Sequence, residues 1–84
     1  MRVLIIEDEA LAAEKLHKTL LEINADIDVV AQLTSVDDSI AWLRNNTHPE
    51  LIFSDIHLAD GICFNIYSEV EPRCPIIFTT AYEG

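Results

Sequence analysis

Acidic and hydroxyl side chains stand directly behind three apolar runs of this sequence. Glu7 and Asp8 follow the first run, Asp55 follows the second, and Thr79 or Thr80 ends the third. Where such runs are neighbouring strands of a parallel sheet, the residues behind them meet at one edge, which is the usual ligand site of open α/β sheets. Three carboxylates at that edge repel one another unless a cation lies between them. A hard divalent ion with oxygen ligands, most simply Mg²⁺, meets this need.

A carboxylate held beside Mg²⁺ is suited to phosphoryl transfer. The ion neutralises charge on the transferring group while Asp55 attacks in line to give an aspartyl phosphate. The backbone carbonyl of His57, two residues further on, offers one more oxygen ligand, and the Thr80 hydroxyl offers a bond to a phosphoryl oxygen. Mg²⁺ keeps several waters, so two or three protein oxygens are enough. We therefore take Asp55 as the candidate acceptor, with Glu7 and Asp8 beside it.

The segments that position these residues alternate between strands and helices. Continuous apolar runs predict buried parallel strands, and apolar residues three or four positions apart predict helices with one buried face. We expect strands at 1–6, 27–33, 50–54 and 76–79, and helices at about 9–22, from a cap at Thr34 or Ser35 to a break at 44–49, and at about 62–70. Polar Asp28 and Gln32 place the second strand nearer an edge. This order predicts an α/β fold, a parallel sheet with helices on both faces.

The helix faces can be predicted in more detail. Asp8 is the expected N-cap of the first helix, because short acidic side chains suit that position. The expected buried residues are Ala13, Leu16, Leu20 and Ile23 in the first helix, Val36, Ile40 and Leu43 in the second, and Cys63, Ile66, Tyr67 and Val70 in the third.

Composition narrows the class of protein. The chain has 84 residues, half of them apolar, which is enough for one globular domain. Its net charge of −10 argues against direct binding of nucleic acid or of an anionic membrane. No apolar run approaches the roughly 20 residues of a membrane span, and no signal peptide is visible. Cys63 and Cys74 match no metal-site spacing, so we expect a cytoplasmic protein with free thiols.

Taken in order, these segments resemble the receiver domain of response regulators in two-component signalling. The resemblance is carried by the acidic pair Glu7-Asp8 after residues 3–6, the acceptor segment 52–56, Gly61, and residues 75–82. The last segment, with Ile-Ile-Phe-Thr-Thr-Ala-Tyr, is similar to receivers of the LytR/AlgR type, whose output domain binds DNA. The resemblance covers all 84 residues. It implies a three-layer, flavodoxin-like (CheY-like) sheet, here reduced to about four strands and three helices.

The resemblance also implies a role for each matching residue. A sensor histidine kinase would phosphorylate Asp55, and Mg²⁺ would be held by Glu7, Asp8, Asp55 and the backbone carbonyl of His57. Thr80 would move toward the phosphoryl group and carry the signal. The small Ala81 would leave access to the site.

The chain departs from the family pattern in two places. Ala59 stands where the family usually has a proline, and the loop before Gly61 is short. The chain also stops after the fourth strand, before the strand that brings the family's lysine, so no residue here takes that role. We expect residues 1–84 to form a C-terminally incomplete receiver domain without its output domain. We further expect association, including homodimers, through the exposed strand at Ile76–Phe78 or a bared helical face.

Two other functions stay open at this stage. A phosphatase of the haloacid-dehalogenase type would also use Asp55 as its nucleophile, but that class needs an acid where His57 stands. A degenerate receiver that works by protein contact alone would have no use for Glu7, Asp8 and Thr80. We therefore expect a phospho-acceptor switch and not a turnover enzyme.

Overall fold

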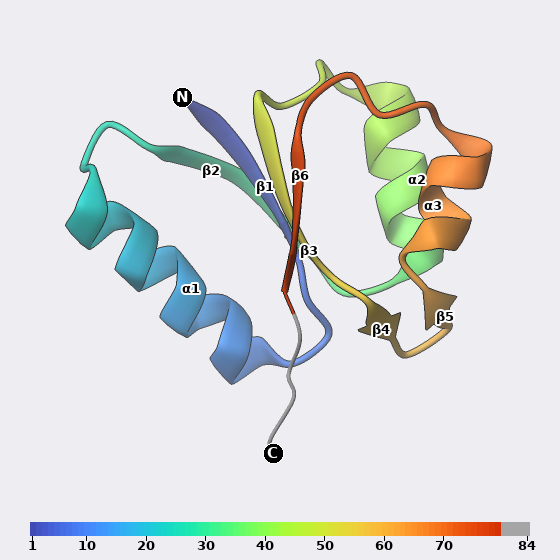
Figure 1. The fold of residues 1–84 in the computed structure, drawn as a ribbon, viewed down its shortest axis with the longest axis horizontal. Coiled ribbons are helices and arrows are strands. Elements are labelled where there is room, and N and C mark those ends of the chain that lie inside the picture. The colour runs from blue at the N-terminus through green and yellow to red at the C-terminus, as the bar shows by residue number, and fades with distance from the viewer. Residues whose placement is uncertain (80–84) are drawn as a thin grey trace.

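A parallel sheet divides the computed structural model into three layers (Figure 1). The structure describes residues 1–79. Its strands are β1 (Arg2–Ile6), β2 (Asp28–Leu33), β3 (Leu51–Asp55) and β6 (Ile76–Thr79), in the spatial order β2-β1-β3-β6. Helix α1 (Ala10–Ile23) lies on one face, and α2 (Val36–Asn45) and α3 (Phe64–Glu69) lie on the other. The predicted α/β fold with helices on both faces is confirmed.

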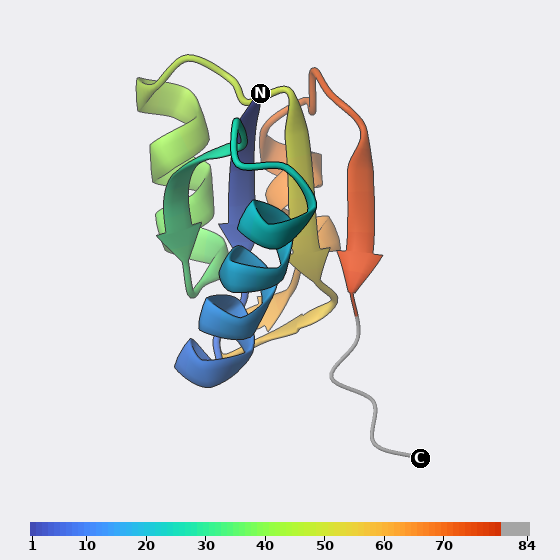
Figure 2. The same cartoon turned by 90° about the vertical axis from the view of Figure 1, so that its left-hand side faces the viewer.

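The two central strands are the ones that carry acids at their ends. β1 pairs in parallel with β2 and β3, and β3 pairs in parallel with β6. The apolar side chains of β1, Val3, Leu4, Ile5 and Ile6, are fully buried, as expected of a strand covered on both faces. β2 is at an edge, as its polar residues predicted. Figure 2 shows that all four strands point the same way, so their carboxyl ends share one edge.

Two hydrophobic clusters pack against the sheet. Leu4, Ile6 and Ile52 meet residues of α2 and α3, including Leu43 and Ile66. The opposite side chains of β1 meet Ala13 and Leu20 of α1. This alternation along β1 fixes the register of the sheet, because a slip of one residue would exchange the two faces.

Helix α1 differs from the prediction at its start and in its buried face. Its N-cap is Glu9 and not Asp8, and the Glu9 side chain makes no capping hydrogen bond. The Glu7 N–H still donates to Leu33 O at 2.8 Å, so the extended chain continues past β1 and the helix begins later. Ile23 is 74% exposed. At about 100° per residue, Ile23 lies roughly 80° around the helix from Ala13, beyond the buried stripe.

The second helix begins as predicted, and the third begins later. Ser35 is the N-cap of α2, and its side chain accepts a hydrogen bond from Asp38 N. Before α3, the chain forms a short antiparallel hairpin that the sequence did not predict, β4 (His57–Leu58) with β5 (Gly61–Ile62). Because residues 61–62 pair in this hairpin, α3 starts at Phe64 and not at Ile62.

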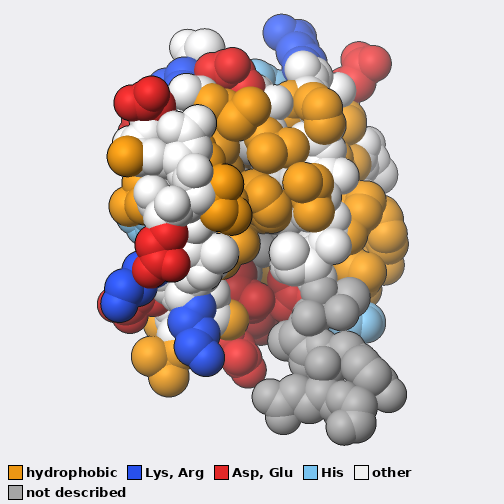
Figure 3. All heavy atoms as spheres, turned by 60° about the vertical axis from the view of Figure 1, so that its left-hand side comes forward, with side chains coloured by type: hydrophobic (Ala, Val, Ile, Leu, Met, Phe, Trp, Pro, Cys, Tyr) orange, Lys and Arg blue, Asp and Glu red, His pale blue; other side chains and the backbone are white. Residues whose placement is uncertain are grey.

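Apolar side chains reach the surface beside β6. Ile77 and Phe78 are 46% and 42% exposed, and the Phe78 ring lies 5.3 Å from that of Phe64 in α3. Figure 3 shows hydrophobic side chains gathered on the side of the sheet that carries α1. Within residues 1–79, β6 has a single strand neighbour, β3. The predicted exposed apolar edge is therefore present, while the association expected from it stays a prediction.

Two smaller observations concern the class of protein. Cys63 and Cys74 are free thiols, as predicted, and Cys63 is buried. Across residues 1–79, no helix combines the length and the apolar character needed to cross a membrane.

Candidate functional site

Three carboxylates meet at the carboxyl ends of the central strands. Glu7, Asp8 and Asp55 each offer an oxygen, and these oxygens all lie within 4.8 Å of one another. Glu7 and Asp55 are buried, 8% and 4% exposed, while Asp8 is exposed. Asp8 is thus the member of the cluster that faces solvent among the described residues.

The pairing of β1 with β3 brings these acids together. Ile6 lies opposite Ser54, so the next residues, Glu7 just beyond β1 and Asp55 at the end of β3, lie at the same level of the sheet. A backbone group holds the Glu7 side chain in place, because Glu7 Oε2 accepts a hydrogen bond from Glu9 N at 3.1 Å. A parallel sheet with these two strands adjacent is therefore sufficient to assemble the cluster.

The electrostatics of the cluster are unfavourable without a counter-ion. Burial raises the pKa of the Glu7 carboxyl from its ordinary value of 4.5 to about 7. The hydrogen bond from Glu9 N works against this rise, and the neighbouring Asp8 and Asp55 add to it. Buried like charges that face one another disfavour ionisation of at least one member. A divalent cation would remove this cost.

The donor set fits Mg²⁺. It consists of oxygen atoms alone, which hard cations prefer, and it leaves room for water ligands on the exposed Asp8 side. The ion pair found within residues 1–79 joins Arg44 of α2 to Glu69 of α3 and involves none of the three carboxylates of the cluster. Glu7, Asp8 and Asp55 are the residues that could hold the ion.

The remaining predicted site residues lie in different places. His57 begins β4 and its side chain is exposed, which leaves its backbone carbonyl as the group of interest. Thr79 ends β6 opposite Asp55. Thr80 and Ala81 lie outside the described residues, so their predicted roles are not tested by the structure.

The sequence analysis missed the contacts of one residue in the loop that follows the acceptor. Asp60, between β4 and β5, accepts hydrogen bonds from two backbone N–H groups at the start of α2. An Asp-Gly pair in a loop signals a turn, but nothing in the sequence indicates a partner 24 residues away. Its position connects the segment after Asp55 to a second helix.

Comparisons with known proteins give sequence relatives over nearly the whole chain. The sensory transduction protein LytT of Enterococcus faecalis is 34% identical over 86 residues, which cover 99% of this chain and 35% of the relative. The sensory transduction protein LytR of Staphylococcus haemolyticus is 31% identical, covering 99% of this chain and 33% of the relative. The chain thus spans about a third of the length of these relatives. No family model matches it.

Solved structures share the fold. The response regulator PhyR from Brucella abortus superposes with a TM-score of 0.81 and 30% identity, covering 96% of this chain and 33% of that one. The HemR receiver domain from Leptospira biflexa superposes with a TM-score of 0.77 and 26% identity, covering 99% of this chain and 66% of that one. Both sequence and fold therefore point to one kind of domain.

Proposed function

The chain is a response-regulator receiver domain, and we propose that it works as a switch in which Asp55 accepts a phosphoryl group from a histidine kinase. The observation that supports the proposal is the cluster of Glu7, Asp8 and Asp55 at the carboxyl ends of β1 and β3. A degenerate receiver that acts by contact alone has no need for three converging carboxylates, two of them buried.

In the proposed reaction, Asp55 is the nucleophile. A carboxylate oxygen of Asp55 forms a bond to phosphorus while the bond between phosphorus and the imidazole nitrogen of phosphohistidine breaks. The electron pair of that bond stays on the imidazole nitrogen, and the product is an acyl phosphate on Asp55. Because Asp55 ends a buried strand, the sheet holds it in one position for in-line attack.

Mg²⁺ would be held by Glu7, Asp8 and Asp55, with the backbone carbonyl of His57 as a further ligand. When bound, it neutralises negative charge on the phosphoryl oxygens and on the carboxylates. Glu7 and Asp8 do no covalent chemistry in this scheme. Their part is to hold the cation beside Asp55, and Glu7 is positioned for it by the hydrogen bond from Glu9 N.

The wider roles follow from the same proposal. The partner that donates the phosphoryl group is a sensor histidine kinase, and the signal is passed to an output domain, proposed to bind DNA and regulate transcription. The relatives are about three times as long as this chain, which leaves room for such a domain. The phosphoryl group is held and not turned over rapidly, so the domain acts as a cytoplasmic signalling module and not as an enzyme.

The test is direct phosphorylation with a small donor. The chain is incubated with acetyl phosphate and Mg²⁺, and the intact mass is measured. We expect one phosphoryl adduct, lost in Asp55→Asn and in excess EDTA. Asp28→Asn, which removes an exposed acid on the edge strand β2, is the matched control and should label like the wild type.

Each other result would identify a different function. Multiple turnover of phosphate esters would indicate a phosphatase and overturn the switch. A folded wild-type chain that binds no Mg²⁺ and forms no adduct would indicate a receiver that works by contact alone.

A further inference from the structure

The loop that follows the acceptor is bonded to a helix from a different part of the chain. Asp60 Oδ1 accepts a hydrogen bond from Val36 N at 2.7 Å, and Asp60 Oδ2 accepts one from Asp37 N at 3.1 Å. These N–H groups belong to the first residues of α2 and have no hydrogen-bond acceptor inside the helix. The N–H of the next residue, Asp38, donates to the side chain of the N-cap Ser35. A carboxylate at a helix N-terminus is also favoured by the helix dipole.

Asp60 lies in the turn between β4 and β5, so its two hydrogen bonds to α2 also hold the β4–β5 hairpin against that helix. β4 starts at His57, two residues beyond Asp55, and pairs with Ile62 of β5. The hairpin is closed at its base by a hydrogen bond from Cys63 N to Ile56 O at 2.8 Å. A short, hydrogen-bonded segment therefore connects Asp60 to the backbone of His57.

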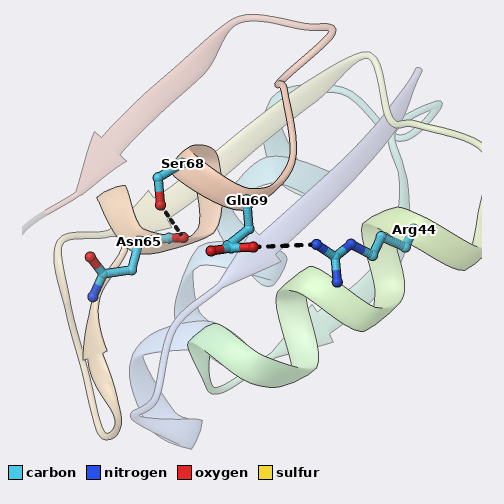
Figure 4. A network of polar contacts seen from close by, with 4 residues as sticks. All are labelled: Arg44, Asn65, Ser68 and Glu69. Carbon is cyan, nitrogen blue, oxygen red and sulfur yellow. Dashed lines mark hydrogen bonds and ion pairs between the residues drawn. The ribbon is translucent and has the colours of Figure 1, made fainter.

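The neighbours of the hairpin leave it little freedom. Gly61 has φ +148°, which side-chain-bearing residues rarely adopt, and a Cβ there would lie 3.1 Å from Asn65 Nδ2 of α3 and 3.7 Å from Val36. Further along, Arg44 of α2 and Glu69 of α3 point toward each other at 3.4 Å (Figure 4). The hairpin thus lies against two helices that also contact one another.

A local role is the simplest alternative for Asp60. N-caps stabilise helices, and most of them come from the residue just before the helix. α2 already has that residue in Ser35. The second cap comes from 24 residues further along the chain, in the segment that directly follows the acceptor. The hydrogen bonds from Val36 and Asp37 also lower the pKa of the Asp60 carboxyl, so it stays ionised at neutral pH.

We propose that Asp60 is a positioning residue for the phosphorylation site: it ties the β4–β5 hairpin to the start of α2 and so holds the His57 backbone next to Glu7, Asp8 and Asp55. This inference rests on the proposed function. Removal of the Asp60 carboxylate leaves the three carboxylates of Glu7, Asp8 and Asp55 in place but lets the His57 carbonyl, the fourth proposed ligand, move away. Cation binding and phosphorylation should weaken together, while the acceptor itself stays intact.

The experiment compares Asp60→Ala, Asp60→Asn and Asp37→Asn with the wild type. Mg²⁺ affinity is measured by calorimetry, and the rate of labelling by acetyl phosphate is measured against Mg²⁺ concentration. We expect Asp60→Ala to raise the Kd for Mg²⁺ about 5–10-fold and Asp60→Asn, which keeps one accepting oxygen, to raise it less. Asp37→Asn is the matched control, since Asp37 gives only its backbone N–H to the bond, and should change Kd less than twofold.

Hydrogen exchange distinguishes a role of Asp60 in positioning the His57 backbone from a role as a helix cap of α2 alone. If the inference holds, the amides of residues 56–62 exchange faster in Asp60→Ala under conditions where the protein stays folded. A lower unfolding midpoint with unchanged Mg²⁺ Kd and unchanged exchange at 56–62 would make Asp60 a helix cap only and overturn the inference. In that case wild-type labelling would still support the proposed function. A wild type that neither binds Mg²⁺ nor labels would overturn the function first, and the inference with it.

Discussion

Asp55 lies directly opposite Thr79 in the parallel pairing of β3 with β6. The two strands stay in register from Ile52 and Ile76 up to these residues, so both end at the same level of the sheet. Asp55 is therefore flanked by Glu7 from β1 on one side and by the end of β6 on the other. The end of β6 thus lies at the level of the acceptor, and the role predicted from the sequence for Thr80 can be tested by comparison with Thr79.

We predict that Thr80→Ala shortens the lifetime of the acyl phosphate and Thr79→Ala does not. A hydroxyl that bonds a charged phosphoryl oxygen contributes about 1.5–3 kcal/mol, so its loss should speed hydrolysis roughly tenfold or more. The measurement is decay of the intact-mass adduct after removal of acetyl phosphate. Equal decay in both variants would contradict the role of Thr80, and a larger effect in Thr79→Ala would transfer it to Thr79.

We predict that Glu7→Gln and Asp8→Asn each weaken Mg²⁺ binding at least tenfold. Either change removes one negative charge and one ligand from a set whose oxygens lie within 4.8 Å of one another. Glu9→Gln is the control, because Glu9 is the neighbouring acid but is outside the cluster. Calorimetric titration with Mg²⁺ provides the measurement. An equal loss of Mg²⁺ affinity in all three variants would mean that the net charge of this segment, and not ligation by Glu7 and Asp8, determines the affinity.

The raised pKa of Glu7 predicts how stability depends on pH without a divalent ion. The folded chain binds the Glu7 proton up to about pH 7, while the unfolded chain releases it near its ordinary value of 4.5. The folded state therefore holds more protons between these values, and the free energy of unfolding should fall as pH rises from about 4.5 to 7. One pKa unit corresponds to about 1.4 kcal/mol, so the rise in the Glu7 pKa sets an upper limit of roughly 3.5 kcal/mol on the change in the free energy of unfolding.

Urea unfolding in EDTA across this pH range measures the effect. Glu7→Gln should flatten the decline, and Glu22→Gln, an exposed acid in α1, should not. Added Mg²⁺ should restore stability most at pH 7 and above, where the cluster is ionised. The same pH dependence in wild type and Glu7→Gln would show that other groups are responsible.

The acidic cluster could be predicted from sequence because topology alone brings it together. Glu7 and Asp55 each follow a continuous apolar run that forms a buried strand, and the carboxyl ends of parallel strands share one edge of the sheet. The limits of the buried face of a helix were harder to predict. Ile23 continues the apolar spacing of α1 but lies to one side of the stripe formed by Ala13 and Leu20. Spacing shows which residues share a face and does not show how wide a face the sheet covers.

The β4–β5 hairpin and the Asp60 bond could not be predicted for a different reason. Two-residue strands are too short to carry a periodic signal, and a glycine in a sequence does not show which backbone angle it adopts, here φ +148° at Gly61. The partner of Asp60 is set by how α2 packs on the sheet. Such tertiary contacts have no local signature. Ser35, whose cap is local, was among the two candidates predicted for that position.

The final prediction concerns the apolar edge at β6. The strand Ile76–Thr79 has no charged side chain, and Ile77 is 46% exposed, so a second copy of the chain can pair with it. We expect the 84-residue chain by itself to form dimers at high concentration and Ile77→Lys to raise the dimer Kd at least tenfold, because a lysine at an edge strand opposes pairing. Sedimentation equilibrium measures both.

Two further variants decide which surface is used. Thr19→Lys places the same charge at an exposed position of α1 and should leave the dimer Kd unchanged. Ile23→Lys tests the apolar end of α1, where Ile23 is 74% exposed. If Ile23→Lys breaks the dimer and Ile77→Lys does not, association runs through the helical face. A wild-type chain that stays monomeric at high concentration would show that neither exposed surface is sufficient, since the repulsion of a net charge of −10 then outweighs the apolar contact.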